Sequence, residues 1–156
     1  MDHLDSAGHA RMVDVSGKDV TRRSATAEGF VSVSATVVAA LRDGTVPKGD
    51  VFAVARAAGI AAAKRTPDLL PLAHVIGVHG ASVDLDLGDA GVRVTATVTA
   101  VDRTGVEMEA YTAVCVAALA IVDMVKGIDR TVAITDVRLL AKSGGRTGSW
   151  HAATID

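Results

Sequence analysis

Residues 105–127 read GVEMEAYTAVCVAALAIVDMVKG and predict one long helix around which the rest of the chain is arranged. Glu107 and Glu109 fall in its first turn, where carboxylates are favourable to the helix dipole. Lys126 and Gly127 then provide a cation and a stop signal at the other end. From Glu107 to Lys126 such a helix rises about 28 Å, roughly the width of a small domain. A helix of this length has to cross the core.

This predicted helix carries two stripes of side chains. At about 100° per residue, one stripe mixes charged with apolar and small residues, namely Met108, Thr112, Cys115, Leu119, Asp123 and Lys126, with Glu109 at its edge. A second stripe on the far side consists of alanines that permit close packing, namely Ala110, Ala113, Ala117 and Ala120. An apolar face with charges only at its two ends suits packing beside a polar pocket. The alternative is an ordinary amphipathic helix on which Asp123 and Lys126 form a solvated pair.

The composition of the chain bounds its class. With 156 residues, nearly half of them hydrophobic, we expect one domain that buries roughly two-thirds of its unfolded surface. The net charge of −2 and only four aromatic residues argue against nucleic acid as a partner. The single Cys115 cannot form an internal disulfide, and the N-terminus lacks the pattern of a signal peptide. We see no apolar run that predicts a membrane span, so we expect a cytoplasmic protein.

Alternation of apolar and polar residues predicts the strands. Five stretches show this period of two: residues 12–16, 28–34, 82–87, 92–99 and 131–140. The residues Thr21-Arg22-Arg23 fall between the first two of them, and turn residues at 88–91 predict an antiparallel hairpin from the next two. The polar residues 1–11 are expected to form a flexible arm. After the last strand, residues 142–148 form a basic, glycine-rich tail.

Two further helices are predicted between the first core strand and the hairpin. Ser34 is placed to cap a short helix that Asp43-Gly44 stops. Asp50 is placed to cap a second helix, Val51–Arg65, whose end Pro67 enforces. The resulting order is β-α-β-β-α-β. This order predicts an α+β, ferredoxin-like sandwich with an antiparallel sheet, helices on one face and N-terminal additions. We expect it to form a single domain over residues 12–148, followed by a tail over 149–156.

Few familiar catalytic signatures occur in the chain. There is no phosphate-binding P-loop, and His74 and His79 lack the partners of a dedicated zinc site, so we expect no metal and no cofactor. A lone histidine after an apolar run is also common as a structural residue. What remains is a set of cations at loops and element ends, Lys48, His74, Lys126, Lys142 and Arg146, which could converge on one small anionic ligand. Asp123, Glu107 and Glu109 are candidate bases.

Six separated motifs resemble, in the same order, those of the cyclic pyranopterin monophosphate synthases, the MoaC family. They are KGDV (48–51), AGIAAAKRT (58–66), PLAH (71–74), TGVEMEA (104–110), DMVK (123–126) and LAKSGG (140–145). The resemblance covers about residues 11–148. The chain differs from the usual family pattern at Ala73, Val75, Tyr111 and Val125, where Cys, Pro, Leu and Cys are usual.

The resemblance implies both a reaction and a set of site residues. The reaction is a lyase step of molybdenum cofactor (molybdopterin) biosynthesis, in which (8S)-3',8-cyclo-7,8-dihydroguanosine 5'-triphosphate becomes cyclic pyranopterin monophosphate and pyrophosphate. Asp123 would be the active-site acid or base, Lys126 its partner, and Lys48 a further catalytic group. The implied substrate-binding residues are Leu72, Ala73, His74, Met108, Glu109 and Lys142, with Arg23 and Glu107 as weaker matches. The family forms homohexamers, as trimers of dimers.

The length of the central helix predicts that the site is shared between two chains. Glu109 and Asp123 are 14 residues apart on one helix, about 21 Å along its axis, which one compact substrate is unsuited to span. Two antiparallel copies would bring these ends together across a two-fold axis. Two other interpretations stay open on the sequence alone. One is a module that binds a small phosphorylated ligand, and the other is a non-catalytic paralogue.

Overall fold

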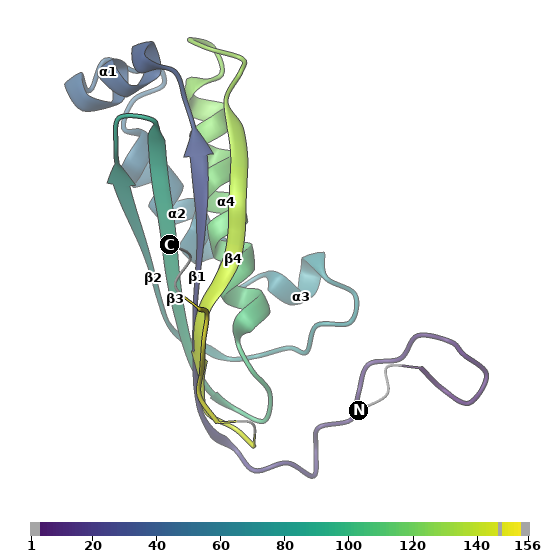
Figure 1. Ribbon diagram of the computed structural model, residues 1–156. Coiled ribbons are helices and arrows are strands. Elements are labelled where there is room, and N and C mark those ends of the chain that lie inside the picture. Colours follow the sequence, from purple (N-terminus) through teal and green to yellow (C-terminus); the bar gives the residue numbers. More distant parts are fainter. Residues whose placement is uncertain (1–3, 147, 154–156) are drawn as a thin grey trace.

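A five-stranded antiparallel sheet with helices packed on one face makes up the fold (Figure 1). The structure is a computed structural model that describes residues 4–146 and 148–153. The strands are β1 (Thr21–Ser32), β2 (Val78–Leu87), β3 (Gly91–Asp102), β4 (Ala133–Ser143) and β5 (Trp150–His151), in the spatial order β2-β3-β1-β4-β5. The helices are α1 (Ala35–Asp43), α2 (Val51–Ala63), α3 (Thr66–Leu69) and α4 (Glu107–Val125). The predicted α+β, ferredoxin-like arrangement is confirmed, with β5 added at one edge.

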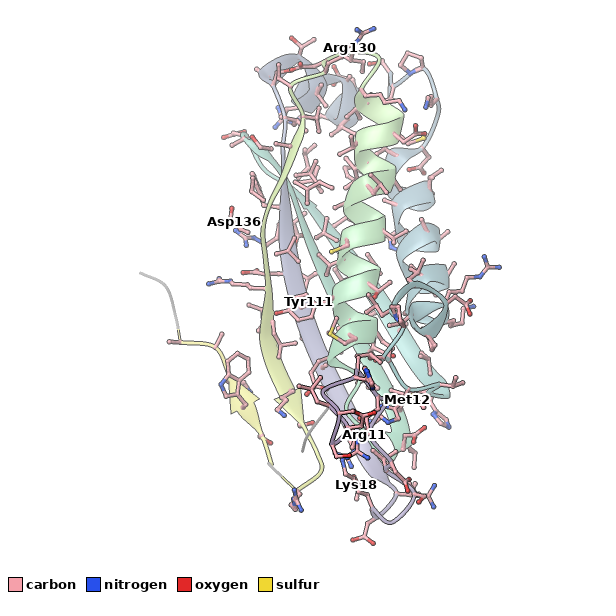
Figure 2. The ribbon with its side chains drawn as sticks, turned by 90° about the vertical axis from the view of Figure 1, so that its right-hand side faces the viewer. Arg11, Met12, Lys18, Tyr111, Arg130 and Asp136 are labelled. Atoms are coloured by element: carbon pink, nitrogen blue, oxygen red, sulfur yellow. The ribbon has the colours of Figure 1, made fainter. Side chains whose placement is uncertain are left out.

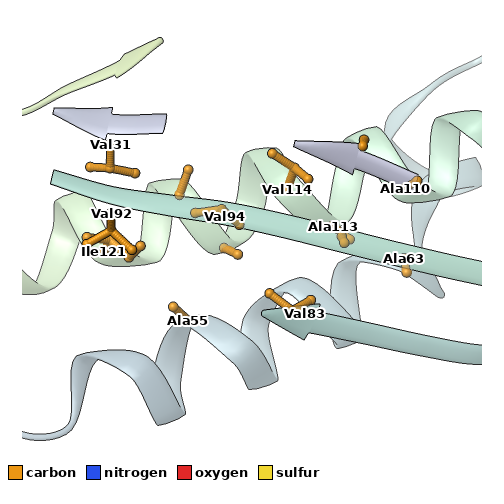
Figure 3. Close-up of a cluster of buried hydrophobic side chains, with 14 of the residues drawn as sticks. Val31, Ala55, Ala63, Val83, Val92, Val94, Ala110, Ala113, Val114 and Ile121 are labelled. Atoms are coloured by element: carbon orange, nitrogen blue, oxygen red, sulfur yellow. The ribbon is translucent and has the colours of Figure 1, made fainter. Parts of the chain in front are cut away.

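The core lies between the sheet and the pair α2 and α4 (Figure 3). Alternate residues of the central strands face the helices and are fully buried, among them Val31 in β1 and Val92 and Val94 in β3. α2 and α4 approach closely because Gly59 has no side chain: a Cβ there would lie 2.8 Å from the carbonyl oxygen of Ala113. The predicted alanine stripe of the long helix is therefore a packing face, which leaves the stripe with Asp123 toward solvent.

Local signals set several element ends as predicted. The carboxylate of Asp50 accepts a hydrogen bond of 3.0 Å from the amide of Ala53 and so caps α2. Gly44 ends α1 in the left-handed conformation, with φ 67°. Ser34 stands at the start of α1, but its side chain makes no capping hydrogen bond there.

Three predicted element boundaries are wrong. Residues 12–16 form no strand, because the carboxylate of Asp14 accepts a hydrogen bond from the amide of Ser16 and closes a local turn. The segment Thr21–Arg23, predicted as a connection, is instead the start of β1. The helix predicted over Val51–Arg65 ends at Ala63, and Pro67 lies in the first turn of α3, a position that suits proline.

The other end of β4 differs from prediction as well. The predicted strand 131–140 extends to Ser143, so Lys142 lies in a strand rather than in a loose tail. β1 supplies the partner, since Ala25 pairs with Lys142 and Ser24 with Ser143. β5 then pairs with the end of β4, opposite Lys142. Lys142 is thus held between two neighbouring strands.

By length and composition alone, α4 could cross a membrane, which the sequence analysis did not anticipate. More than half of that apolar stretch is buried within the fold. A core helix of a soluble protein meets the same criteria. The expectation of a flexible arm concerns residues 1–11, of which residues 1–3 lie outside the described part. In the remainder, Leu4 bridges Ala10 across a turn closed by Asp5 and His9.

Candidate active site

At the C-terminal end of α4, the carboxylate of Asp123 lies between two lysine side chains. The Nζ atom of Lys126, one turn further along the helix, is 2.7 Å from Oδ1. The Nζ atom of Lys48, in the loop before α2, is 2.8 Å from Oδ2 and also donates to the backbone carbonyl of Asp123 at 2.8 Å. The predicted contact between Asp123 and Lys126 is confirmed, and the fold adds Lys48 to it.

These two lysines determine the ionisation of Asp123. The hydrogen bond from Lys126, followed by that from Lys48, lowers the pKa of the Asp123 carboxyl to about 2. All three side chains are about half exposed. The group, which we term the lysine-aspartate triad (Lys48, Asp123 and Lys126), therefore presents one carboxylate and two ammonium groups on an open surface at neutral pH.

At the N-terminal end of α4 there is a cavity of about 640 Å³. Five basic side chains line it, namely Lys18, Arg23, Arg103, Lys142 and Arg146. Glu107 contributes a carboxylate whose Oε1 is 3.2 Å from the Nζ atom of Lys142, and both of these side chains are about one-quarter exposed. We term this feature the basic cavity. Its excess of cations suits a ligand that carries several negative charges.

A glycine turn shapes one wall of the basic cavity. Gly144 and Gly145 follow β4 with φ angles of 95° and 73°, which glycine adopts readily and other residues rarely. A Cβ on Gly145 would overlap the guanidinium of Arg23. Arg23 is also fixed from β3, because its Nε donates a hydrogen bond of 3.2 Å to the carbonyl of Asp102. Close backbone approach thus holds Arg23 at the cavity wall.

Glu109 is buried next to the basic cavity rather than within it. Glu109 is only 2% exposed, and its Oε2 has no hydrogen-bond partner among the described residues. Burial, reinforced by the charges of Glu107 and Asp102, raises the pKa of the Glu109 carboxyl. Its neighbour Met108 is 45% exposed. The raised pKa makes the Glu109 carboxyl easier to protonate than an exposed glutamate.

His74 contacts the N-terminal segment of the chain. Its Nε2 lies 2.7 Å from the carbonyl oxygen of Val13, so the ring donates a hydrogen bond from that nitrogen. Arg103 holds the same segment at a second point, since its Nε donates a hydrogen bond of 3.1 Å to the carbonyl of Lys18. Leu72 and Ala73 precede His74 in an irregular loop, and Leu72 is 42% exposed. The histidine therefore helps to place a wall of the basic cavity.

Six of the predicted site residues thus form two groups at opposite ends of α4. Lys48, Asp123 and Lys126 meet at one end of α4, whereas Arg23, Glu107 and Lys142 meet at the other. Glu107 and Asp123 are 16 residues apart, about 24 Å along the helix. Lys18 and Arg103 were missed by the sequence reasoning, although Arg103 stands in the polar run just before α4. No group of three or more potential metal ligands occurs among the described residues.

Comparisons with known proteins give one consistent result. The sequence profile of the MoaC family matches residues 12–145. A protein of Streptomyces coelicolor named cyclic pyranopterin monophosphate synthase is 60% identical over 148 residues, which cover 95% of this chain and 87% of that protein. A protein of the same name from Nocardioides sp. is 58% identical, over 95% of this chain and 93% of its own. Another, from Chloroflexus aurantiacus, is 53% identical, over 96% and 93%.

Proposed function

The chain belongs to the MoaC family, and from this membership we propose that it is a cyclic pyranopterin monophosphate synthase. It is then a lyase of molybdenum cofactor biosynthesis that converts the cyclised guanosine triphosphate into cyclic pyranopterin monophosphate and pyrophosphate. The observation that carries the proposal is the lysine-aspartate triad, in which one ionised carboxylate and two ammonium groups are held together at hydrogen-bond distance. A module that only binds phosphates would need the cations but not this carboxylate.

The lysine-aspartate triad provides groups for proton transfer. Rearranging a cyclised nucleotide into a pterin requires protons to be removed from and delivered to ring atoms. The carboxylate of Asp123 is ionised at neutral pH and can accept a proton. The ammonium groups of Lys48 and Lys126 can donate protons and stabilise negative charge that develops on the substrate. We assign the chemistry to these three residues.

The basic cavity provides recognition of the triphosphate. Lys142 and Arg23 contribute cations at its wall, joined by Lys18, Arg103 and Arg146. Charge-assisted hydrogen bonds from lysine and arginine to phosphate oxygens are short and strong, so several of them can hold the leaving pyrophosphate. Leu72, Ala73, His74, Met108 and Glu109 are assigned to substrate binding from the family resemblance, since none of them is among the residues that line the basic cavity. Neither assignment requires a metal or an organic cofactor.

We place the complete site between two chains. One chain separates the lysine-aspartate triad from the basic cavity by the length of α4, and the triad faces solvent. The exposed stripe of α4 also carries apolar residues, with Leu119 58% and Met108 45% exposed. Two copies with antiparallel α4 helices would cover this stripe and join each triad to the partner's cavity. We propose such dimers, assembled three to a homohexamer in the cytoplasm.

Turnover of the cyclised triphosphate tests the proposed function. We expect the purified protein to release pyrophosphate and a pterin product, detected by a phosphate-release assay and by fluorescence after oxidation. The Streptomyces coelicolor relative serves as the positive control. A correctly assembled protein that forms neither product, while the relative does, would overturn the proposal.

Subunit exchange tests the shared site. At substrate concentrations well below the wild-type KM, Asp123→Asn and Lys142→Met chains are each expected to show little activity, the first through a lower kcat and the second through a higher KM. If each site combines one triad with the partner's cavity, a mixed dimer holds one doubly damaged site and one intact site. Random exchange makes half of the dimers mixed, so about one-quarter of the wild-type activity should return.

The matched control mixes Asp123→Asn with Lys126→Ala, which lie in the same triad. Each site of that mixed dimer carries one change, so no activity should return. Failure of the first mixture to recover, with exchange confirmed by mass spectrometry, would place the whole site within one chain.

A further inference from the structure

Two contacts join the first two turns of α4 to the end of β4. Glu107 pairs with Lys142 at 3.2 Å, and the hydroxyl of Tyr111 accepts a hydrogen bond of 2.9 Å from the amide of Leu139. Glu107 and Tyr111 are four residues apart and so lie on one face of the helix, one turn from each other. Figure 2 shows Tyr111 reaching from α4 toward the sheet. The two contacts are therefore successive links between the same two elements.

The amide of Leu139, which donates to Tyr111, lies beside an irregular part of β4. In the pairing with β1, Ala27 is opposite Leu139 and Thr26 is opposite Ala141, so Leu140 is an extra residue. Such a bulge interrupts the ladder and bends the strand. A partly buried backbone N–H that the ladder does not satisfy has to find another acceptor. The phenol oxygen of Tyr111 is that acceptor.

A second irregularity lies just before the first. It falls between Glu28 and Phe30 in β1, opposite Asp136, which has a φ angle of 54°. Between the two irregularities, β4 is fixed by Arg138, whose Nε donates a hydrogen bond of 2.8 Å to the buried Glu28. That pair fixes the strand before the bulge at Leu140, whereas Lys142 lies beyond it. Tyr111 holds the residue that directly precedes the bulge.

We propose that Tyr111 is a positioning residue for Lys142. Its hydroxyl fixes where the bulge occurs in β4, and the position of the bulge sets how far the ammonium of Lys142 reaches into the basic cavity. Glu107 then orients that ammonium from the preceding turn of the same helix. This inference rests on the proposed function insofar as Lys142 binds the substrate there. Tyr111 itself touches neither substrate nor triad in this scheme.

The variant Tyr111→Phe removes only the hydroxyl and so tests the contact directly. We expect amide exchange in the peptide that covers residues 138–142 to become roughly three- to ten-fold faster, the fold-change that one neutral hydrogen bond supports. Trp150 is the only tryptophan of the chain. It lies in β5 and pairs with Lys142 of β4, so its fluorescence emission should shift as well. Unchanged exchange in this peptide would overturn the proposal.

A double-mutant cycle with Lys142 separates positioning from general stability. With Lys142 present, Tyr111→Phe should raise KM for the cyclised triphosphate roughly three- to ten-fold and leave kcat within about two-fold. With Lys142→Met, the same change should have no further effect on KM. An equal rise of KM in both backgrounds would overturn the positioning role.

A matched control removes a hydroxyl away from the bulge. The Oγ1 atom of the fully buried Thr66, in α3, donates a hydrogen bond of 3.2 Å to the carbonyl of Ala63, and Thr66→Val deletes it at nearly constant volume. It should lower stability without moving KM. A rise of KM with Thr66→Val equal to that of Tyr111→Phe would show that lost stability alone explains the effect.

The same cycle on the affinity for pyrophosphate, measured by calorimetry, requires no turnover. A wild-type protein that does not turn over the cyclised triphosphate would overturn the proposed function. Equal losses of pyrophosphate affinity with and without Lys142 would instead overturn the role of Tyr111. The two failures are thus distinguishable.

Discussion

The two ends of α4 hold similar charges in different surroundings. At the C-terminal end, the lysine-aspartate triad is about half exposed, and its charges are held in place mainly by one another. At the N-terminal end, the pair Glu107 and Lys142 is about one-quarter exposed and lies in the basic cavity. Glu109, two residues after Glu107 in the helix, is almost fully buried.

The difference shows which end is complete within one chain. The basic cavity is enclosed by segments far apart in sequence, namely residues 17–23, 103–107 and 142–146. The triad has an ordered geometry without an enclosing wall. Because proton transfer is most effective in a site that excludes water, the catalytic role proposed for the triad would call for a cover from a second chain. Each prediction below tests one side of this comparison.

The largest effect is expected at the exposed end. Asp123→Asn keeps the size of the side chain but removes the carboxylate that we propose as the proton acceptor, so kcat should fall by about 10²- to 10⁴-fold. Folding should be unaffected because the side chain is exposed. Steady-state kinetics and circular dichroism check this. The control Asp84→Asn alters an exposed aspartate of β2 and should leave kcat unchanged. Wild-type turnover in Asp123→Asn would remove Asp123 from the chemistry.

A smaller effect, on binding, is expected at the enclosed end. Gly145→Ala places a Cβ against the guanidinium of Arg23 and imposes a left-handed backbone that costs about 1–2 kcal/mol. We expect KM to rise by about ten-fold while kcat changes little, because Arg23 is assigned to substrate binding and not to proton transfer. Gly148→Ala is the control, since Gly148 has φ 66° but no heavy atom within 4 Å of its Cβ position. An equal KM for both variants would mean that Arg23 does not depend on this turn.

Stability should respond to the buried carboxyl. The pKa of Glu109 is raised in the folded state, so the stability linked to it is fully present below the unfolded value of 4.5 and is lost as pH rises through the folded value. Glu109→Gln has no carboxyl to ionise, so this loss of stability at higher pH does not occur. At pH 7 the variant should therefore unfold a few degrees above the wild type, and at pH 4 the gain should disappear. Calorimetry at the two pH values measures it.

Glu107→Gln is the matched control for that comparison. It removes the ion pair with Lys142 instead of an unpaired buried charge, so it should not raise the unfolding temperature at pH 7. A gain for Glu107→Gln, or none for Glu109→Gln, would contradict the assignment of the burial penalty to Glu109.

The smallest effect is expected from pH, because the Asp123 carboxyl should not titrate in the neutral range. Because Lys126 and Lys48 lower the pKa of Asp123 to about 2, its carboxyl stays ionised throughout the neutral range, and its ion pairs are lost only as pH falls from 3.8 toward that value. The profile of kcat/KM against pH should show no ionisation of Asp123 above about pH 4. Carbon NMR of the carboxyl checks this, and Lys126→Ala should move the pKa back toward 3.8. A titration of Asp123 near neutral pH would show that the triad is not formed in solution.

Local signals explain which elements were predictable. The long helix was predicted over 107–126 and found as Glu107–Val125, because acidic residues, a lysine and a glycine mark its two ends. The β2–β3 hairpin was predictable for the same reason, since glycines mark its turn. The start of β1 and the end of β4 were not, because residues 21–23 and 141–143 are strands only by pairing with other strands.

The sequence alone therefore determined the fold class, the central helix and the chemical types in the site, through periodicity, caps and six short motifs. Tertiary structure alone decided which of these groups meet. Lys48 reaches Asp123 from 75 residues away, and Tyr111 reaches the amide of Leu139, 28 residues away, beside a bulge in β4. The physical reason is that helix periodicity acts over a few residues, whereas contacts such as these depend on how strands and helices pack across the core.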